Sequence, residues 1–404
     1  MIARLEAGLD ASAEVIGGKA VGLVRLLRLG LAVPDGFVVG TADCREYLAT
    51  GRRPDGLDEA AAVLGGGAGS AGGGAVSVRS GAAVSMPGMM STLLDVRPPL
   101  GDAVAAVFES WNTPRAITYR RLHDIADEAG TAVIVQAMVY GDRDGRSGSG
   151  VAFSRDPNTG DPGPYGEFLP GRRGDAVVAG EERTLPVGEL ASRLPDVWAS
   201  LRAALERVER HYRDVCHVEF TVESGRLWLL QVRPGGVAGH AAARVAVDLA
   251  EEGLITRAEA VARVDLDRLP RVPRLPAEVP PLARGLGASP GVATGRVATT
   301  ADAAVRMTGP VILVRPTTSP LDLHGLAAAA GVVTARGGPA SHAAVVARSM
   351  GKPAVVGAPL EALAEGTVIT VDGSTGVVAA GEHPPRIPGA DPAETRLRAW
   401  ATGL

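Results

Sequence analysis

The sequence is poor in cysteine, in aromatic residues and in net charge, and each shortage narrows the class of protein. Its two cysteines, Cys44 and Cys216, stand far apart and give no disulfide framework, which suits a reducing compartment. Aromatic residues make up only 3%, so the cores must be built mainly from Ala, Val and Leu. A net charge of −4 argues against a nucleic-acid-binding surface and leaves a small-molecule partner open.

Long apolar runs are missing as well. No stretch approaches the ~18 uninterrupted apolar residues that indicate a membrane span. The start of the chain, MIARLEAGLD, has acidic residues and lacks the apolar core of a targeting signal. We therefore expect a cytoplasmic protein with no membrane-spanning segment.

Lysine is scarce, whereas glycine and proline are plentiful. Only two of the 41 basic residues are lysines, Lys19 and Lys352, and both lie inside motifs. A genomic bias toward arginine would leave lysine only where arginine cannot substitute. The 53 glycines and 29 prolines are typical of short strands joined by phosphate-binding loops, and 404 residues allow two or three domains.

The stretch from Thr334 to Gly357 has His342 at its centre. An apolar run at 330–335 predicts a buried strand, and a helix is expected to begin between Pro339 and Ser341 and to end at Gly351. A histidine in the first turn of a helix is disfavoured as an imidazolium, while the helix N-terminus favours a bound anion. His342 is therefore a candidate phosphoryl acceptor. The alternative is a surface histidine that caps a helix.

Two motifs in the N-terminal half suggest phosphate binding. Gly17-Gly18-Lys19 opens a predicted helix within residues 15–39, which is a plausible phosphate-binding turn although it is not the P-loop pattern. Arg79 ends a short β-branched run, where its guanidinium can reach a phosphate with paired donors.

A hairpin is predicted at residues 219–233, with its turn at Ser224-Gly225. Glu219 and Gln231 would project from its two neighbouring strands, where a carboxylate and an amide oxygen can hold Mg²⁺ against a triphosphate. A plain edge hairpin is the alternative.

These motifs together resemble the phosphoenolpyruvate-utilising enzymes of the pyruvate phosphate dikinase type. The pattern around the histidine runs from Gly337-Gly338 through Ser341-His342 to Gly351, and the N-terminal matches over residues 15–235 include GGKAVGL, SVRSGAAVSMPGMM, SGSGVAFSRDPNTG and EFTVESGRLWLLQVR. The resemblance implies an α/β (α+β) fold, with an ATP-grasp-like nucleotide-binding domain and a swivelling phosphohistidine domain. It makes His342 the phosphorylated residue and assigns Lys19 and Arg79 to the phosphates. It also places Glu219, Gln231 and Arg233 at the nucleotide and Mg²⁺ site, with Glu219 and Gln231 as the metal ligands.

The same reasoning divides the chain into four parts. We expect the nucleotide-binding domain at 1–240, a helical and Pro-rich linker at 241–282, the phosphohistidine domain at 283–382 and a tail at 383–404. Strands of the phosphohistidine domain are predicted near 295–298, 311–314 and 368–371. The prolines between 270 and 281 predict a semi-rigid tether for a moving domain, or an ordinary spacer.

Three departures from the family pattern bear on function. His217 stands where the family has an acidic residue two positions before the strand glutamate, which lowers the negative charge of a Mg²⁺ site. Only about twenty residues separate Met90 from Trp111, so the nucleotide cover should be reduced. The sequence ends about twenty residues after the histidine domain, so we expect the phosphoenolpyruvate- and pyruvate-binding barrel of the family to be missing.

The sequence therefore predicts an ATP-dependent phosphotransferase that phosphorylates its own His342, with inorganic phosphate as a co-substrate if it follows the dikinase scheme. The acceptor, pyruvate or another small molecule, would be bound by another chain such as a separate barrel subunit. Two alternatives stay open, namely a phosphotransferase acting on an antibiotic or another specialised metabolite, and a non-catalytic nucleotide-binding remnant.

Overall fold

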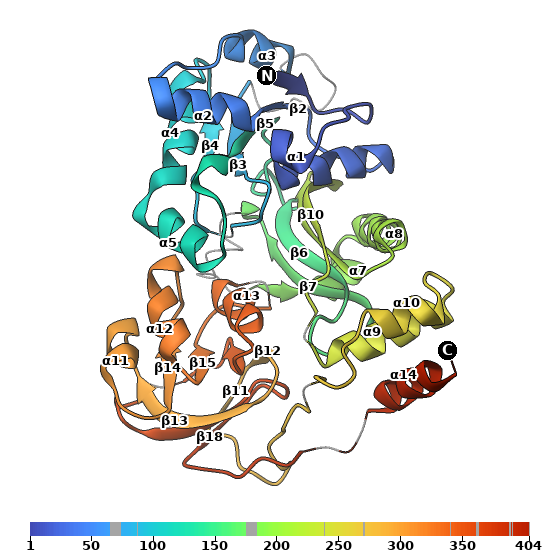
Figure 1. The fold of residues 1–404 in the computed structure, drawn as a ribbon, viewed down its shortest axis with the longest axis vertical. Coiled ribbons are helices and arrows are strands. Elements are labelled where there is room, and N and C mark those ends of the chain that lie inside the picture. The colour runs from blue at the N-terminus through green and yellow to red at the C-terminus, as the bar shows by residue number, and fades with distance from the viewer. Residues whose placement is uncertain are drawn as a thin grey trace. The chain divides into compact units, whose positions relative to one another are not determined.

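The computed structural model describes residues 1–64, 74–86, 88–174, 184–237, 239–269, 271–339, 341–360, 363–387, 389 and 391–403. The chain folds into two compact units, which are drawn in Figure 1. The first comprises Met1–Ser147 and Val218–Arg233, and the second comprises Gly148–His217 and Pro234–Leu404. The chain thus leaves the first unit after Ser147 and returns to it for a single hairpin.

The first unit is built on an antiparallel sheet with the strand order β1-β2-β5-β3-β4. Its elements are β1 (Ile2–Arg4), α1 (Ala13–Arg28), β2 (Gly36–Val39), α2 (Thr41–Thr50), α3 (Leu57–Leu64), β3 (Val76–Gly81), β4 (Thr92–Val96), α4 (Gly101–Glu109), α5 (Pro114–Leu122) and β5 (Ala132–Ala137), followed later in the chain by β9 (Cys216–Glu223) and β10 (Arg226–Pro234).

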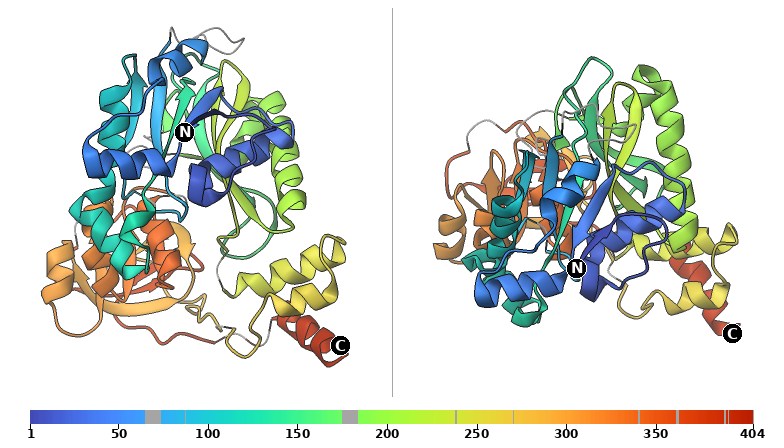
Figure 2. Two further views of the ribbon diagram at one scale, coloured as in Figure 1. Left: turned by 45° about the horizontal axis from the view of Figure 1, so that its top comes forward. Right: turned by 90° about the horizontal axis from the view of Figure 1, so that it is seen from above.

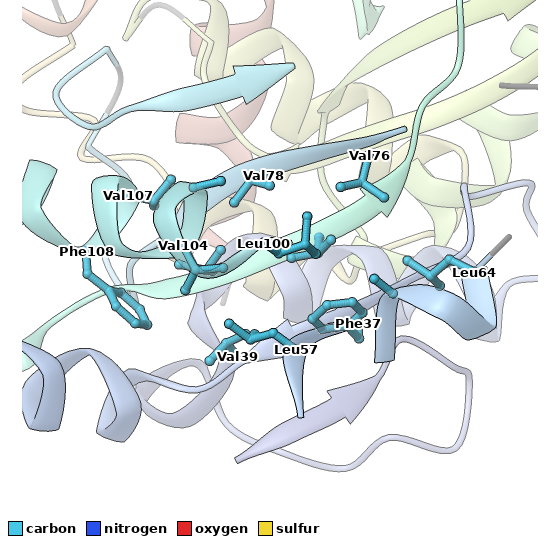
Figure 3. Packing of buried hydrophobic residues seen from close by; sticks show 14 of the residues in the cluster. Phe37, Val39, Leu57, Leu64, Val76, Val78, Leu100, Val104, Val107 and Phe108 are labelled. Carbon is cyan, nitrogen blue, oxygen red and sulfur yellow. The ribbon is translucent and has the colours of Figure 1, made fainter. Parts of the chain in front are cut away.

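One hydrophobic core lies between this sheet and the helices α2, α3 and α4 (Figure 3). Val76 and Val78 of β3 belong to it, together with Val104 and Phe108 of α4. Successive side chains of a strand point to opposite faces, so Arg79 projects away from this core although all six residues of β3 are buried. The packing of the valines thereby determines the direction of the arginine.

The hairpin of β9 and β10 turns at Ser224 and Gly225, as the sequence predicts. Both residues have left-handed backbone angles, with φ of 50° and 81°, which suits the tight two-residue turn of an antiparallel hairpin. The Ser224 hydroxyl donates a hydrogen bond of 2.5 Å to Asp144, which ties the turn to the loop after β5. The turn position sets which residues of β9 and β10 face each other.

The second unit begins with strands and a long helix, continues with two shorter helices and ends with an eight-stranded sheet and a last helix. Its elements are β6 (Gly148–Arg155), β7 (Pro162–Pro170), β8 (Leu185–Pro186), α7 (Leu190–Arg193), α8 (Pro195–Tyr212), α9 (Ala241–Glu251), α10 (Arg257–Ala262), β11 (Ala283–Arg284), β12 (Leu286–Ser289), β13 (Val292–Ala298), α11 (Ala301–Arg306), β14 (Val311–Arg315), α12 (Leu323–Ala328), β15 (Gly331–Thr334), α13 (His342–Ser349), β16 (Ala354–Val356), β17 (Val368–Asp372), β18 (Val377–Ala380) and α14 (Pro392–Thr402).

The eight-stranded sheet has the order β11-β18-β17-β13-β14-β15-β16-β12. Strands β13, β14, β15 and β16 run parallel, and strands on both sides of them pair antiparallel. Alanines of α11 and α13 cover one face together with Leu326 of α12, and the other face has its own aliphatic cluster. The strands predicted near 295–298, 311–314 and 368–371 lie within β13, β14 and β17.

Residues 383–404, which sequence reasoning treated only as a tail, contain the helix α14. Leu397 of α14 is fully buried in a cluster with α9 and α10, and Figure 2 shows this helix beside them at the C-terminus. The Thr256 side chain caps α10 through a complete capping box with Glu259. The expected boundaries at 240, 282 and 382 stay a prediction.

The Pro-rich segment is partly fastened to the eight-stranded sheet. Arg274 and Arg386 form a two-way backbone bridge with hydrogen bonds of 2.9 Å, and the backbone N–H of Leu275 donates to the buried Asp372 at 2.8 Å. Leu275 also packs against Val377 and Ala379. The part of the segment that is free to act as a tether is therefore shorter than its prolines suggest.

Among the described helices, none combines the length and the apolar composition that crossing a bilayer would demand.

Arg155 at the end of β6 joins this strand to two helices. Its side chain is 3% exposed and contacts Glu209 of α8 at 2.8 Å, and Glu252 and Asp248 at the end of α9 at 2.7 and 3.5 Å. We expect Arg155→Met to destabilise the second unit by about 3 kcal/mol, because it removes a buried cation from three carboxylates, of which Glu209 is only 12% exposed. Urea unfolding measures the loss.

The exposed pair of Arg202 and Glu206 on α8 provides a matched control. Arg202→Met should change the free energy of unfolding by less than ~0.5 kcal/mol, since exposed i,i+4 pairs contribute little. Equal effects of the two substitutions would show that the Arg155 cluster does not hold β6 to the helices.

Candidate functional site

The Gly17-Gly18-Lys19 segment is placed by the end of β3. Gly17 has a left-handed φ of 78° inside α1, so the helix kinks there instead of opening at the diglycine as expected. A Cβ on Gly17 would fall onto the carbonyl oxygen of Gly81, and the N–H of Gly18 donates to the carbonyl of Ala82 at 3.0 Å. Only glycine permits this approach. It brings Lys19 next to Gly81, two residues beyond Arg79.

Arg79 is the centre of the site. Its guanidinium donates to the carbonyl of Leu230 at 3.0 Å, to Oε1 of Gln231 at 3.3 Å and to Oε2 of Glu219 at 3.4 Å. The side chain is only 10% exposed. One buried cation therefore joins β3 to both strands of the hairpin, and it gathers residues that lie about 140 positions apart in the sequence.

The charges of this cluster are unbalanced. The pKa of Lys19 is lowered to about 7, mainly by burial and also by the nearby Arg79 and Arg233, while Glu219 opposes the decrease. Burial is also the main cause of a lowered pKa at Arg79, with Glu219 again opposing and Arg233 adding to the decrease. Three cationic side chains thus act on one another around a single carboxylate, and such an arrangement favours a bound polyanion.

Glu219 and Gln231 present oxygen atoms to the same nitrogen of Arg79. A carboxylate and an amide oxygen that converge in this way suit Mg²⁺, which prefers oxygen ligands and usually shares them with substrate phosphates and water. Among the described residues, no three His, Cys, Asp or Glu side chains come together in a way that could hold a metal ion. The donor set therefore fits Mg²⁺ only as a partner of bound phosphates.

His342 is the first residue of α13, behind the N-cap Ser341, as the sequence predicts. Its Nδ1 lies 3.2 Å from the Thr318 hydroxyl, and its buried Nε2 has no partner among the described residues. Burial lowers the pKa of His342, and the negative charge of Asp322 opposes this decrease. The ring is therefore neutral near pH 7. Burial is the cause found in the structure, whereas sequence reasoning relied on the helix N-terminus.

Both glycines before His342 are required by close contacts. Gly337 has φ of 101°, and a Cβ there would lie 3.0 Å from the Cβ of Ser341. A Cβ on Gly338 would fall onto the carboxylate of Glu167. The diglycine that the sequence suggested as a tight turn is thus constrained by the backbone at the first position and by a neighbouring side chain at the second.

Sequence reasoning missed two groups near His342, Thr318 and Asp322. Both follow β14 directly, in the segment Thr317-Thr318-Ser319-Pro320 and the short helical turn Pro320–Asp322. Polar residues at the carboxyl end of a parallel strand often meet a ligand, and this signal could have identified them.

Two of the departures from the family pattern have a clear placement. His217 on β9 rests against the ring of Phe153, with the ring centroids 5.0 Å apart. Met86 and Met89, which lie just before the shortened stretch between Met90 and Trp111, are buried with Trp111 and Ala116, and the Arg115 side chain donates to the Met89 carbonyl at 3.0 Å.

Comparisons with known proteins identify the family of the chain. The family model "Pyruvate phosphate dikinase, AMP/ATP-binding domain" matches residues 50–185 and 192–253, and "PEP-utilising enzyme, mobile domain" matches residues 307–376. The pyruvate, phosphate dikinases of Rhizobium meliloti and Clostridium symbiosum are 36% and 33% identical to the chain over 91% and 98% of its length. The chain belongs to the pyruvate phosphate dikinase and phosphoenolpyruvate-utilising enzyme family, and it carries the ATP-binding and phosphohistidine domains of an ATP-dependent phosphotransferase.

The chain spans 56% and 60% of the length of these two relatives. Among solved structures, D-alanine–D-alanine ligase from Bacillus anthracis is 12% identical, with 55% of this chain and 56% of that chain covered and a TM-score of 0.27, which is too low to bear on the fold. The family models confirm the predicted α/β class with a nucleotide-binding domain and a mobile domain.

ATP binding at pH 7 should be accompanied by proton uptake. Lys19 has a pKa of about 7 in the free protein, and bound phosphates favour its charged form. The number of protons taken up on binding can be measured by titration calorimetry with Mg-ATP in buffers of different ionisation enthalpy. The wild type should take up about half a proton more than Lys19→Arg, whose side chain is charged before and after binding.

The extra uptake should shrink at pH 6, because Lys19 is already protonated there before ATP binds. Equal uptake by the wild type and Lys19→Arg at pH 7, with both proteins binding ATP, would show that Lys19 does not face the phosphates.

Proposed function

We propose that the chain is a cytoplasmic, Mg²⁺-dependent phosphotransferase that uses ATP to phosphorylate its own His342 and passes the phosphoryl group to a small-molecule acceptor. One observation carries the proposal. Arg79 collects Glu219 and Gln231 within 3.4 Å, and the same cluster holds a positive excess through Lys19 and Arg233.

The cluster divides naturally into two functions. Lys19, Arg79 and Arg233 would bind the phosphates and stabilise the charge that develops on the transferring group. Glu219 and Gln231 would hold Mg²⁺, which would be shared with those phosphates. The metal, when bound, neutralises phosphate charge. Arg79 would then exchange its present acceptors for phosphate oxygens, which are stronger partners for a guanidinium.

His342 supplies the nucleophile. We assign the ring proton to Nδ1, which then donates to the Thr318 hydroxyl 3.2 Å away and leaves the lone pair on Nε2. In the dikinase scheme, Nε2 attacks the β-phosphorus of ATP, an N–P bond forms, and AMP leaves with the electron pair of the broken P–O bond. Inorganic phosphate then takes the γ-phosphoryl group. The products of the two steps are AMP, pyrophosphate and a single phosphoryl group on His342.

Thr318 and Asp322 would support this step. Attack by Nε2 places a positive charge on the ring, and the negative charge of Asp322 already favours a charged His342. Thr318 keeps the ring in one orientation through its 3.2 Å contact with Nδ1. Both are positioning residues in this scheme.

The acceptor is pyruvate or another small molecule that binds outside residues 1–404. We propose that a phosphoenolpyruvate- or pyruvate-binding barrel holds it, either on a separate subunit or elsewhere in a longer chain. The mobile domain would carry the phosphoryl group to that barrel.

One observation favours a second candidate, a nucleotide-binding protein without turnover. His217 replaces an acidic residue two positions before Glu219, and its ring lies against Phe153. An imidazole in place of a carboxylate removes a negative charge from the proposed Mg²⁺ site, so we expect a lower metal affinity.

The wild type and His342→Ala should be incubated with ATP, Mg²⁺ and phosphate at mildly alkaline pH. We expect an acid-labile mass increase of one phosphoryl group in the wild type only, with AMP as the nucleotide product. Intact-protein mass spectrometry and nucleotide chromatography measure both.

His217→Asp serves as a comparison variant. Phosphorylation in His217→Asp alone would mean that the natural chain has lost turnover through this residue. No phosphorylation in either protein, with ATP bound, would replace the enzyme proposal by the nucleotide-binding one.

A further inference from the structure

Four buried polar atoms of the mobile domain have no hydrogen-bond partner among the described residues. They are Nε of Arg315, Oγ1 of Thr334, Oγ of Ser341 and Nε2 of His342. Buried polar groups are nearly always paired, since an unpaired one costs about 1–3 kcal/mol. Four of them within one stretch of the mobile domain indicate that a further group belongs there.

The four atoms come from one corner of the eight-stranded sheet. Arg315 and Thr334 are partners in the parallel pairing of β14 and β15, at the carboxyl ends of both strands. Ser341 is the N-cap of α13 and directly precedes His342. Crevices at the carboxyl ends of parallel strands are the usual ligand sites of such sheets.

Gly337 connects the two hydroxyls. An ideal Cβ at Gly337 would lie 3.1 Å from Oγ of Ser341 and 4.0 Å from Oγ1 of Thr334. The absence of a side chain at this position leaves both hydroxyls beside the same turn. Thr334 is 1% exposed and Ser341 is 7% exposed, so neither hydroxyl is an ordinary surface group.

The local chemistry suits a group rich in hydrogen-bond acceptors and negative charge. An N-cap serine normally accepts a hydrogen bond from the first turn of its helix, but Ser341 makes no such side-chain bond. Its hydroxyl can therefore donate elsewhere, next to the positive end of the α13 dipole. Arg315 adds a cation whose charge is partly offset by Asp322 at 3.6 Å.

We propose that Thr334 and Ser341 form the receptor for the phosphoryl group on His342, and that their hydroxyls donate hydrogen bonds to its oxygens after transfer. This inference rests on the proposed function, because it places the phosphoryl group on Nε2. It adds two positioning residues in the carrier domain, and it explains why their hydroxyls are left unpaired in the unphosphorylated protein.

The test measures the ionisation of the phosphoryl group itself. Phosphoramidate transfers its phosphoryl group to a histidine ring and releases ammonia, so it can phosphorylate His342 in the full chain without ATP. The ³¹P chemical shift of the phosphohistidine is then followed against pH. His342→Ala identifies the signal.

Hydrogen bonds to the dianion lower the second pKa of a phosphoryl group. We expect this pKa in Thr334→Val and in Ser341→Ala to lie above that of the wild type by about half a unit or more, and the double variant to shift furthest. Unchanged titration in both single variants would overturn the inference.

Thr370→Val is the matched control. Thr370 is a fully buried threonine of the same sheet, but its hydroxyl is paired with Thr294 and with the carbonyl of Gly381, both at 2.8 Å. This variant should leave the ³¹P titration unchanged. Thr334→Val should leave the urea midpoint of the unphosphorylated protein unchanged or higher, since it removes an unpaired hydroxyl.

The two proposals fail in different ways. Phosphorylation by phosphoramidate but not by ATP, with the expected shift in pKa, would contradict the proposed function and support the receptor. Phosphorylation by ATP with no shift of the pKa in the variants would support the proposed function and contradict the receptor. If neither reagent phosphorylates His342, both proposals are contradicted.

Discussion

The nucleotide-binding unit depends on the burial of one guanidinium. Arg79 is held by a carbonyl, an amide oxygen and a carboxylate from the β9–β10 hairpin, and these contacts keep that distant part of the chain beside β3. Burying a cation is unfavourable unless it is paired. Here the pairing is incomplete, because Lys19 and Arg233 add further positive charge around the single carboxylate of Glu219. The folded unit therefore has a strong physical reason to bind a polyanion.

The mobile domain also lacks interactions in the free protein, but what it lacks is hydrogen-bond partners and not negative charge. Its hydroxyls at Thr334 and Ser341 and its Nε2 at His342 are buried without partners in the described part of the chain. In both places the free protein lacks interactions that a phosphate or phosphoryl group would supply. A phosphoryl carrier moves its group between two such sites. Each site therefore needs polar groups that stay unpaired until the phosphoryl group arrives.

Much of this could be predicted from local sequence. The strand at 330–335, the start of α13 at Ser341 and the turn at Ser224-Gly225 follow from apolar periodicity, capping residues and turn chemistry, which act over a few residues. The long motifs around Lys19, Arg79 and His342 indicated the family, and the structure brings Arg79, Glu219 and Gln231 together as expected.

Other features depend on contacts that no local pattern encodes. The kink at Gly17 arises because the backbone of α1 lies against the carbonyl of Gly81. The sequence of residues 13–28 does not predict this contact. The bridge between Arg274 and Arg386 and the packing of α14 on α9 and α10 join segments more than 100 residues apart. Thr318 contacts His342 because β14 ends and α13 begins at the same edge of the sheet.

The central claim is that the nucleotide cluster and His342 act in one reversible phosphoryl transfer. The most direct test is the exchange of isotopically labelled AMP into ATP in the presence of Mg²⁺, phosphate and pyrophosphate, with no acceptor added. The account predicts label in ATP that disappears in Lys19→Met and in His342→Ala. Exchange that persists in His342→Ala, or its absence in a folded wild type that binds AMP and ATP, would contradict it.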